Sequence, residues 1–358
     1  MNILVDLGHP GHVHFFRHQI ALWRGHGHAV TLTSRDIPIV GKLLAAYGLS
    51  ARVVGTRRRG ALGLGLELLE RTAKLAPLLA RGGFDAAAAI GGALTAPACR
   101  LAGVPCVVFD DTDTAGLENR ISHPLATVVA TPSGYPRDLG PKQVRYDGLH
   151  ELAYMHPARF TPDPAVAARY GFSPAAPYAV VRFSSWEAGH DLAARTASLE
   201  EKLALVAALG QRGQVLLVPE GDPPRELAAR TPPIAPEDFH HLLALARYCV
   251  TEGATTASEA CIRGVPSLYL NPSRPFYIGE LAQTGLLAVG RPGQGLAAAL
   301  EALCARFPDP APARDAAARF VAARIDVAAF AADLVERTAR REWPPRRDCS
   351  KKTIIPKC

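Results

Sequence analysis

The sequence predicts an α/β protein with two doubly wound parallel-sheet domains. Three observations favour this fold class. Short apolar runs alternate with segments of helical periodicity along the chain, as in βαβ units. A Pro-rich stretch from His150 to Pro177 interrupts this alternation. With 358 residues, the chain is also too long for one ordinary hydrophobic core, so two domains are expected.

The first half of the chain contains six candidate strands, each a short apolar run. They are Ile3–Leu7, Ala29–Thr33, Ala51–Val54, Ala86–Ile90, Cys106–Phe109 and Thr127–Ala130. Between the first two, residues 13–24 predict a helix because Phe16, Ile20 and Trp23 share one face and Gly25 follows. These elements predict a Rossmann-like domain over residues 1–155.

A second alternating series follows the Pro-rich stretch, which we interpret as an interdomain linker. Its predicted strands are Ala179–Phe183, Val215–Val218, Tyr248–Thr251 and Ser267–Leu270, and its predicted helices are Thr196–Leu209, Phe239–Ala246 and Thr256–Arg263. A second Rossmann-like domain is therefore expected over residues 156–325, facing the first across a cleft. Residues 326–341 are expected to form a helix that packs back on the first domain, and residues 342–358 a basic, disordered tail.

The most informative segment is T-E-G-A-T-T-A-S-E-A at residues 251–260, directly after an apolar strand. Its small residues form a turn whose N–H groups, together with the N-terminus of the following helix, suit a phosphate. Gly253, Thr255 and Thr256 are therefore candidate nucleotide-binding residues, and the carboxylate of Glu259 lies one helical turn further on. The structural alternatives are a capping threonine and a solvated glutamate that complements the helix dipole.

The charge of the chain is concentrated at its C-terminus. The formal net charge is +7, but seven Lys and Arg residues lie between Arg340 and Cys358 against only Glu342 and Asp348. The rest of the chain is nearly neutral, which argues against a specific nucleic-acid-binding protein. Contact of the tail with anionic lipid or nucleic acid is the alternative to a solvated, disordered end.

Cysteine spacing and hydropathy further limit the class of protein to which this chain can belong. The seven cysteines show neither a C-x-x-C pair nor a zinc-binding spacing, which argues against a disulfide framework. No run approaches the roughly 20 apolar residues that a membrane span needs. The N-terminal M-N-I-L-V-D lacks the basic region of a secretory signal. We expect a cytoplasmic protein, with peripheral contact at the inner face of the membrane as a further option.

Several motifs, in the same order, resemble GT-B glycosyltransferases of the MurG type. L-G-H-P-G-H-V at residues 7–13 is similar to their glycine-rich first loop, L-A-G-V-P at 101–105 and G-L-E-N-R at 116–120 are similar to later segments of their first domain, and G-A-T-T-A-S-E at 253–259 resembles their donor motif. The chain to about residue 335 also resembles an uncharacterised GT-B-like family. UDP-GlcNAc 2-epimerases share the same fold and some of the same segments.

The resemblance implies transfer of a sugar from a nucleotide-sugar donor, UDP-linked, to a glycan or lipid-linked acceptor such as a precursor of cell-envelope polysaccharide. It assigns Glu259 to the ribose hydroxyls and Gly11 to the first loop of the ligand site. Arg182 and Ser184 stand where the relatives carry a Gly-Gly-Ser phosphate loop, and a guanidinium can bind phosphate bidentately. No cofactor and no metal are expected, because the nucleotide-sugar is the substrate.

The catalytic candidates lie in the first domain. His12 matches the family loop and is expected to act as a general base or to steady the leaving phosphate; a capping or glycan-stacking histidine is the alternative. Asp111 and Asp113 belong to D-D-T-D, which ends the fifth strand where α/β sheets bind ligands, although such a run also forms turns. His9, His14 and His18 accompany His12, but no carboxylate or cysteine stands at ligand spacing, so no metal site is predicted.

The sequence also allows two other functions, and it contains one basic, leucine-rich segment whose role has two interpretations. A UDP-sugar 2-epimerase or hydrolase would use Glu118 and Asp113 as an acid/base pair and would turn over donor alone. A non-catalytic sugar-nucleotide-binding protein would bind without turnover. Residues 57–66, R-R-R-G-A-L-G-L-G-L, combine positive charge with leucines, which the resemblance connects with a lipid-linked acceptor or an anionic membrane. The alternative is that these leucines belong to the core.

Overall fold

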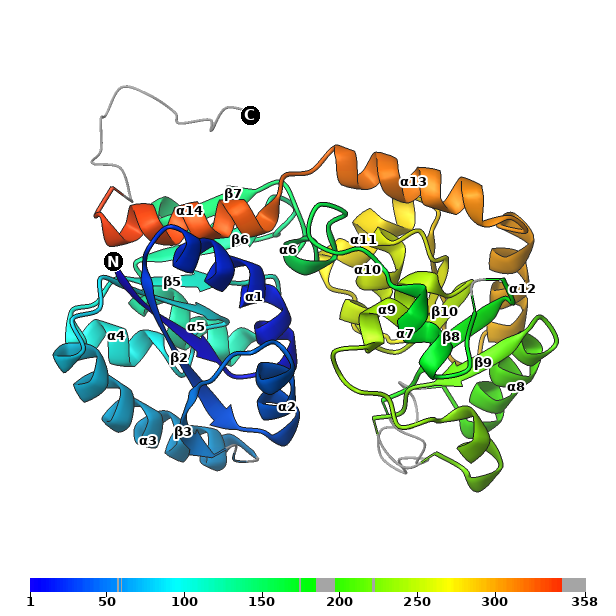
Figure 1. Cartoon of the computed structure of the whole chain (residues 1–358), viewed down its shortest axis with the longest axis horizontal. Helices are drawn as coiled ribbons and strands as arrows, with labels where there is room; N and C mark the ends of the chain where they lie inside the picture. The colour runs from blue at the N-terminus through cyan, green and yellow to red at the C-terminus, as the bar shows by residue number, and fades with distance from the viewer. Residues whose placement is uncertain (57, 59, 174, 185–196, 221–222, 343–358) are drawn as a thin grey trace. The chain divides into compact units, whose positions relative to one another are not determined.

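The computed structural model describes residues 1–342 except 57, 59, 174, 185–196 and 221–222 (Figure 1). The chain forms two compact units. The first contains Met1–Pro132, Arg137–Tyr146 and the chain from Ala328 onward, and the second contains Ser133–Pro136 and Asp147–Val327. Apart from Ser133–Pro136, the chain enters the second unit at Asp147, upstream of the predicted boundary at residue 155. Apart from Glu342, the predicted tail lies outside the described residues.

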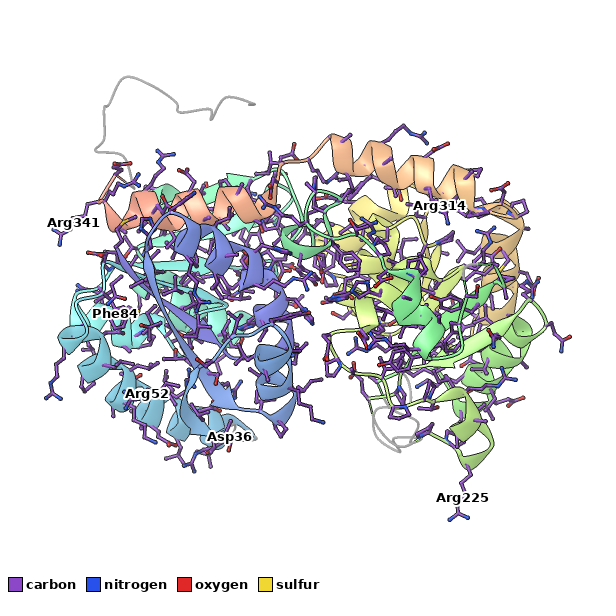
Figure 2. All side chains as sticks on the ribbon, in the orientation of Figure 1. Asp36, Arg52, Phe84, Arg225, Arg314 and Arg341 are labelled. Atoms are coloured by element: carbon purple, nitrogen blue, oxygen red, sulfur yellow. The ribbon has the colours of Figure 1, made fainter. Side chains whose placement is uncertain are left out.

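The first unit is built on a seven-stranded parallel sheet of order β3-β2-β1-β4-β5-β6-β7. The strands are β1 Asn2–Leu7, β2 Ala29–Asp36, β3 Arg52–Thr56, β4 Ala86–Ile90, β5 Cys106–Phe109, β6 Val128–Pro132 and β7 Gln143–Tyr146. Asp36 and Arg52 mark the end of β2 and the start of the edge strand β3 (Figure 2). The strand order reverses between β1 and β4, and ligands bind at the carboxyl ends of strands at such a point.

The helices of the first unit include one from the far end of the chain. They are α1 Pro10–Gly25, α2 Pro38–Ala46, α3 Gly60–Arg81, α4 Ala96–Ala102, α5 Gly116–Leu125 and α14 Val327–Ala339, with a 3-10 turn at Gly140–Lys142. The fully buried Trp23 of α1 donates its Nε1–H to the carbonyl oxygen of Ala332 in α14 at 3.1 Å. Helix α14 therefore packs on the first unit.

The first half of helix α3 inverts the usual distribution of polar and apolar side chains, whereas Leu75 and Leu79 further along the helix are buried. Its buried face carries Glu67 and Arg71, both 0% exposed. Leu62, Leu66 and Leu69 lie on the opposite face at i, i+4 and i+7, and they are 88%, 55% and 68% exposed. The alternative that the leucines of residues 57–66 belong to the core is therefore wrong for Leu62 and Leu66, while Leu64 is half-buried and not exposed. Neither α3 nor any other described helix is long and apolar enough to cross a membrane.

The second unit contains a five-stranded parallel sheet of order β12-β11-β10-β8-β9. Its strands are β8 Tyr178–Arg182, β9 Gln214–Leu217, β10 Tyr248–Thr251, β11 Ser267–Tyr269 and β12 Leu287–Val289. Its helices are α6 Leu152–Met155, α7 Pro164–Arg169, α8 Leu199–Gly210, α9 Phe239–Leu245, α10 Ala254–Ile262, α11 Phe276–Gln283, α12 Leu296–Arg306 and α13 Pro310–Ala322, with a 3-10 segment at Arg225–Arg230. The strand order reverses between β8 and β10.

The stretch predicted to be an interdomain linker, His150 to Pro177, is instead packed into the second unit. It contains α6, whose residues are all buried, and α7. Pro164 does not break structure: it occupies the first turn of α7, and the side chain of Asp163 caps that helix by accepting the N–H of Ala165 at 2.9 Å. Proline suits this position because the first helical N–H groups have no partner within the helix.

Candidate functional site

The N-terminus of α10 lies at the carboxyl end of β10, beside the reversal of strand order in the second unit. Gly253 is the N-cap residue and no side chain caps the helix. Its own N–H donates to Oγ1 of Thr251 at 3.0 Å. The amides of the first turn, Ala254 to Thr256, are therefore available, and the helix dipole favours an anion in front of them.

Arg182 brings a second positive group to the same helix end. It is the last residue of β8, and the strand register pairs it with Thr251 of β10. Its Nη1 donates to Oγ1 of Thr256 at 3.1 Å, and its Nη2 lies 3.0 Å from a carboxylate oxygen of the exposed Glu220. A cation beside the positive end of a helix is unfavourable by itself, so the arrangement favours an additional anion.

Glu259 is a buried carboxylate on α10 rather than a solvated residue of the first turn. Only 4% of the residue is exposed, and its Oε1 accepts hydrogen bonds from Tyr154 Oη at 2.7 Å and His240 Nε2 at 3.0 Å. Burial opposes ionisation, but His240, Tyr154 and Arg182 outweigh it and lower the pKa of Glu259. Its Oε2 accepts no hydrogen bond from the described residues, which leaves this oxygen available for a ligand hydroxyl.

Ser184 has a different role from the expected phosphate contact. Its backbone N–H and its Oγ–H both donate to Oε2 of Glu252, each at 2.8 Å. Glu252 is buried and also forms an ion pair of 2.9 Å with the buried Lys202. Both donors of Ser184 are thus committed to a protein carboxylate, so this residue anchors the chain after β8 instead of offering a hydrogen to a diphosphate.

The first unit contains a pocket of about 480 Å³ at the carboxyl ends of β1, β2, β4 and β5. It spans the reversal of strand order between β1 and β4, where doubly wound sheets bind ligands. Its lining includes Gly8, His12, Arg35, Gly91 and Glu118. Gly11 is not in this lining, and its N–H donates to Nδ1 of His9 within the cap of α1.

His12 faces this pocket with a defined tautomer. The N–H of Gly8 donates to Nδ1 of His12 at 3.1 Å. The neutral ring then carries its proton on Nε2, which makes Nε2 a hydrogen-bond donor. Of the two expected roles, steadying an oxygen of the substrate fits this geometry, whereas general-base catalysis does not.

The floor of the pocket rests on a buried ionic network that sequence reasoning missed. Asp6 accepts two hydrogen bonds from Nη2 of Arg71, at 2.6 and 2.8 Å, and one from Oγ1 of Thr95 at 2.6 Å. A lone Asp inside an apolar strand was the available signal. Because the carboxylate is fully engaged, we interpret Asp6 as a residue that positions β1, α3 and α4 and not as an acid or base.

The acidic residues after β5 divide into two groups. Asp110 and Glu118 line the pocket, whereas Asp111 and Asp113 lie outside its lining. Asp110 is buried and pairs with Nε2 of His123 at 2.9 Å, while Glu118 is exposed. Asp111 accepts the hydroxyl hydrogen of Thr112 within the turn. Of these carboxylates, Glu118 is the one placed to meet a substrate hydroxyl in the pocket.

Comparison with known sequences reaches part of the chain. Residues 1–155 match a family described as "Protein of unknown function (DUF354)". A search of curated proteins found no match. The family match covers the first sheet as far as β7 and its pocket, and it carries no stated activity.

Comparison with solved structures covers nearly the whole chain. A UDP-GlcNAc 2-epimerase from Neisseria meningitidis, bound to UDP-GlcNAc, is 12% identical with a TM-score of 0.69, over 95% of this chain and 100% of that one. CalG4, the calicheamicin glycosyltransferase, is 17% identical with a TM-score of 0.61, over 96% and 99%. MurG from Acinetobacter baumannii is 15% identical with a TM-score of 0.58, over 94% and 99%. The predicted GT-B fold is therefore confirmed, and its neighbours include both glycosyltransferases and epimerases.

Proposed function

We propose that this protein is a glycosyltransferase that binds a UDP-sugar with its second unit and an acceptor with the pocket of its first unit. One observation carries the proposal: Arg182 and the uncapped N-terminus of α10 converge on one point, and the same helix carries the ionised Glu259. The positive groups suit a diphosphate, and the carboxylate suits the ribose hydroxyls. Gly253, Thr255 and Thr256 supply the turn and the first-turn amides.

The proposed reaction replaces one C–O bond by another. A hydroxyl oxygen of the acceptor attacks the anomeric carbon of the donor, the bond to the diphosphate breaks, and the nucleoside diphosphate leaves with the electron pair. Arg182 and the dipole of α10 offset the charge that develops on the leaving group, without a metal. In the first unit, Glu118 takes the proton of the acceptor hydroxyl, and Nε2–H of His12 donates a hydrogen bond to a substrate oxygen.

The second candidate is a UDP-sugar 2-epimerase or hydrolase. It is supported by the likeness to the epimerase reported above, and it would use the same donor site with Glu118 as an acid or base. It differs in one measurable respect, because it consumes the UDP-sugar without an acceptor. A non-catalytic sugar-nucleotide-binding protein would bind the same ligands and release no product.

Binding tests the shared premise of all three functions. We expect UDP and UDP-GlcNAc to raise the midpoint of thermal unfolding more than GDP, dTDP and CMP do, because a ligand of the folded state stabilises it. Arg182→Ala and Glu259→Gln should each weaken UDP binding about 10- to 100-fold, as expected for charge-assisted hydrogen bonds. Arg212→Ala is the matched control, because Arg212 forms an ion pair with Glu301 elsewhere in the second unit. Equal UDP affinity in all four proteins would refute the donor site.

The products formed from UDP-GlcNAc then distinguish the three candidate functions. Release of UDP from UDP-GlcNAc only when an acceptor mixture is added supports transfer. Release of UDP, or formation of a 2-epimer, with donor alone supports the second candidate. Tight binding with neither product would indicate a binding protein.

We further propose that the exposed face of α3 contacts an anionic membrane. Leu62, Leu66 and Leu69 form an apolar stripe, and Arg58, just before the helix, is exposed. A basic residue beside exposed leucines is the combination that binds a helix to the surface of an anionic bilayer. Leu64 of the same helix lines the first-unit pocket, so the proposed membrane contact would lie on the helix that borders the acceptor site.

A further inference from the structure

Three potential metal ligands meet near the start of β2, at the opposite end of the first sheet from its pocket. His26 lies at the end of α1, His28 lies just before β2, and Glu336 lies on α14. Nδ1 of His26 is 2.7 Å from Oε1 of Glu336, and Nε2 of His28 is 3.5 Å from the same oxygen. All three ligand atoms lie within 4.8 Å of one another. The His–Glu pair joins residues separated by 310 positions in the sequence, so no spacing motif could reveal it.

Two of the three ligand atoms are more buried than is usual for a surface ion pair, those of Glu336 and His28. Glu336 is 7% exposed, so its carboxylate needs a partner that compensates for lost hydration. Nε2 of His28 is buried and makes no hydrogen bond in the described part of the chain. A buried ring nitrogen without a hydrogen bond carries a cost that a bound cation would remove.

The distances suit a tetrahedral cation. Zinc bonds to histidine nitrogen and carboxylate oxygen are about 2.0–2.2 Å, which places tetrahedral ligand atoms about 3.4 Å apart. The observed separations of 2.7 and 3.5 Å bracket this value, so small side-chain rotations would complete the geometry. His26 has a side chain that is 54% exposed, which leaves room for water as a fourth ligand.

We propose that His26, His28 and Glu336 bind one Zn²⁺ ion through Nδ1, Nε2 and Oε1. Two histidines and one carboxylate form a common protein donor set for zinc. The ion joins the turn between α1 and β2 to α14, and it thereby fastens the C-terminal helix to the first unit. This site is independent of the nucleotide site in the second unit and of the proposed transfer reaction.

Two neighbouring groups define the surroundings of the ion. Nη2 of Arg340 lies 3.2 Å from Oε2 of Glu336 and orients the carboxylate through the oxygen that does not bind the metal. The terminal nitrogen of Met1 lies 3.4 Å from Nδ1 of His28. When Nε2 binds zinc, Nδ1 carries the ring proton.

The test is a titration of the full-length protein with Zn²⁺ at about pH 8, followed by calorimetry and by thermal unfolding. The background carries Cys349→Ser and Cys358→Ser, because thiolates bind zinc. We expect one ion per chain and a raised unfolding midpoint. Co²⁺ should give the intense visible absorption of a tetrahedral site.

Variants locate the ion. His28→Gln and Glu336→Gln should each weaken Zn²⁺ binding at least tenfold and abolish the Co²⁺ bands, with circular dichroism checking that both remain folded. His9→Asn is the matched control, because it removes a histidine near His12 and His14 and keeps a side chain that can cap α1. No stoichiometric binding, undiminished binding in both site variants, or loss of binding in His9→Asn would each overturn the assignment.

Discussion

At the scale of single residues, Glu259 keeps its charge inside the protein because its neighbours compensate for burial. Tyr154 and His240 donate to one oxygen, and Arg182 adds a favourable field, so the pKa of Glu259 lies below its usual value of 4.5. These neighbours come from α6, α9 and β8. A carboxylate held in this way is ready to accept hydrogen bonds from ribose without first losing a proton.

The lowered pKa predicts how the stability contribution of Glu259 depends on pH. A carboxyl whose pKa is lower in the folded state stabilises the protein above its unfolded pKa, and this stability disappears as the pH falls through the folded pKa. Glu259→Gln should therefore lose about 1–3 kcal/mol of unfolding free energy near pH 6, and the deficit should shrink below pH 4.5. Urea unfolding of the wild type and of Glu259→Gln, at several pH values from about 6 to about 3.5, measures this difference in unfolding free energy. A deficit independent of pH would contradict the ionised state.

Gly92 illustrates a residue fixed by two separate constraints. Its φ is +70°, and a Cβ at this position would lie 2.5 Å from Cγ2 of Val108. Gly103 has nearly the same φ, +72°, but a Cβ there would meet nothing within 4 Å. We expect Gly103→Ala to cost about 1–2 kcal/mol from backbone strain, and Gly92→Ala about 1–3 kcal/mol more from overpacking. Thermal unfolding of the two variants separates backbone strain from overpacking, and Val108→Ala should partly restore the stability of Gly92→Ala. Equal losses of stability in Gly92→Ala and Gly103→Ala would exclude the clash with Val108.

At the scale of elements, α3 shows how a local pattern can mislead. The leucines of its first half suggest a core face, yet Glu67 and Arg71 are the residues buried there. Arg71 is held by Asp6 of β1, and Glu67 forms an ion pair of 2.7 Å with Arg35 of β2. Asp6 precedes Arg71 by 65 positions and Arg35 precedes Glu67 by 32, so the sequence of α3 alone contains no sign of these partners. Burial of the ion pairs turns the leucines outward.

The outward leucines give a test of membrane contact. Leu62→Asp with Leu66→Asp should reduce sedimentation with vesicles containing anionic phosphatidylglycerol by at least tenfold, because apolar contact and charge attraction act together. Stability should change by less than about 0.5 kcal/mol, since both side chains are exposed. Leu101→Asp is the matched control, because Leu101 of α4 is 73% exposed and lies outside the stripe. Binding that is equal in the double variant and the control would remove α3 from the proposed contact.

The sequence predicted those elements whose own residues determine them. The apolar runs of β1, β4, β5 and β10 identify buried parallel strands, and the turn of small residues identifies the start of α10. β7, with the sequence Q-V-R-Y, was missed because an edge strand needs little apolar character, and β12 has only three residues. The prediction of a Pro-rich interdomain linker was wrong because proline also occurs in the first turn of helices. For Glu259, the motif indicated the residue, but its partner Tyr154 lies 105 positions away and left no local signal.

At the scale of the whole molecule, the chain contributes Ser133–Pro136 to the second unit, leaves the first unit again after Tyr146 and returns to it at Ala328. The first unit therefore depends on residues from both ends of the chain, and α14 is part of its core through Trp23 and Ala332. The proposed nucleotide site belongs to the second unit alone, and the proposed zinc site belongs to the first. Because the two sites lie in different units, UDP and Zn²⁺ should each slow hydrogen exchange in a different set of segments.

Hydrogen exchange of the full-length protein tests this separation. A ligand that binds the folded state slows the local opening reactions that expose the amides of its own site. With saturating UDP, we expect slower exchange in peptides from β8 and from the first turn of α10, and unchanged exchange in peptides that contain His26, His28 or Glu336. With Zn²⁺ the pattern should reverse, and Arg182→Ala should cancel only the effect of UDP. Protection by UDP confined to Gly8–His12 and Gly91–Thr95 would instead place the nucleotide in the first-unit pocket, and the assignment of donor and acceptor to the two units would have to be exchanged.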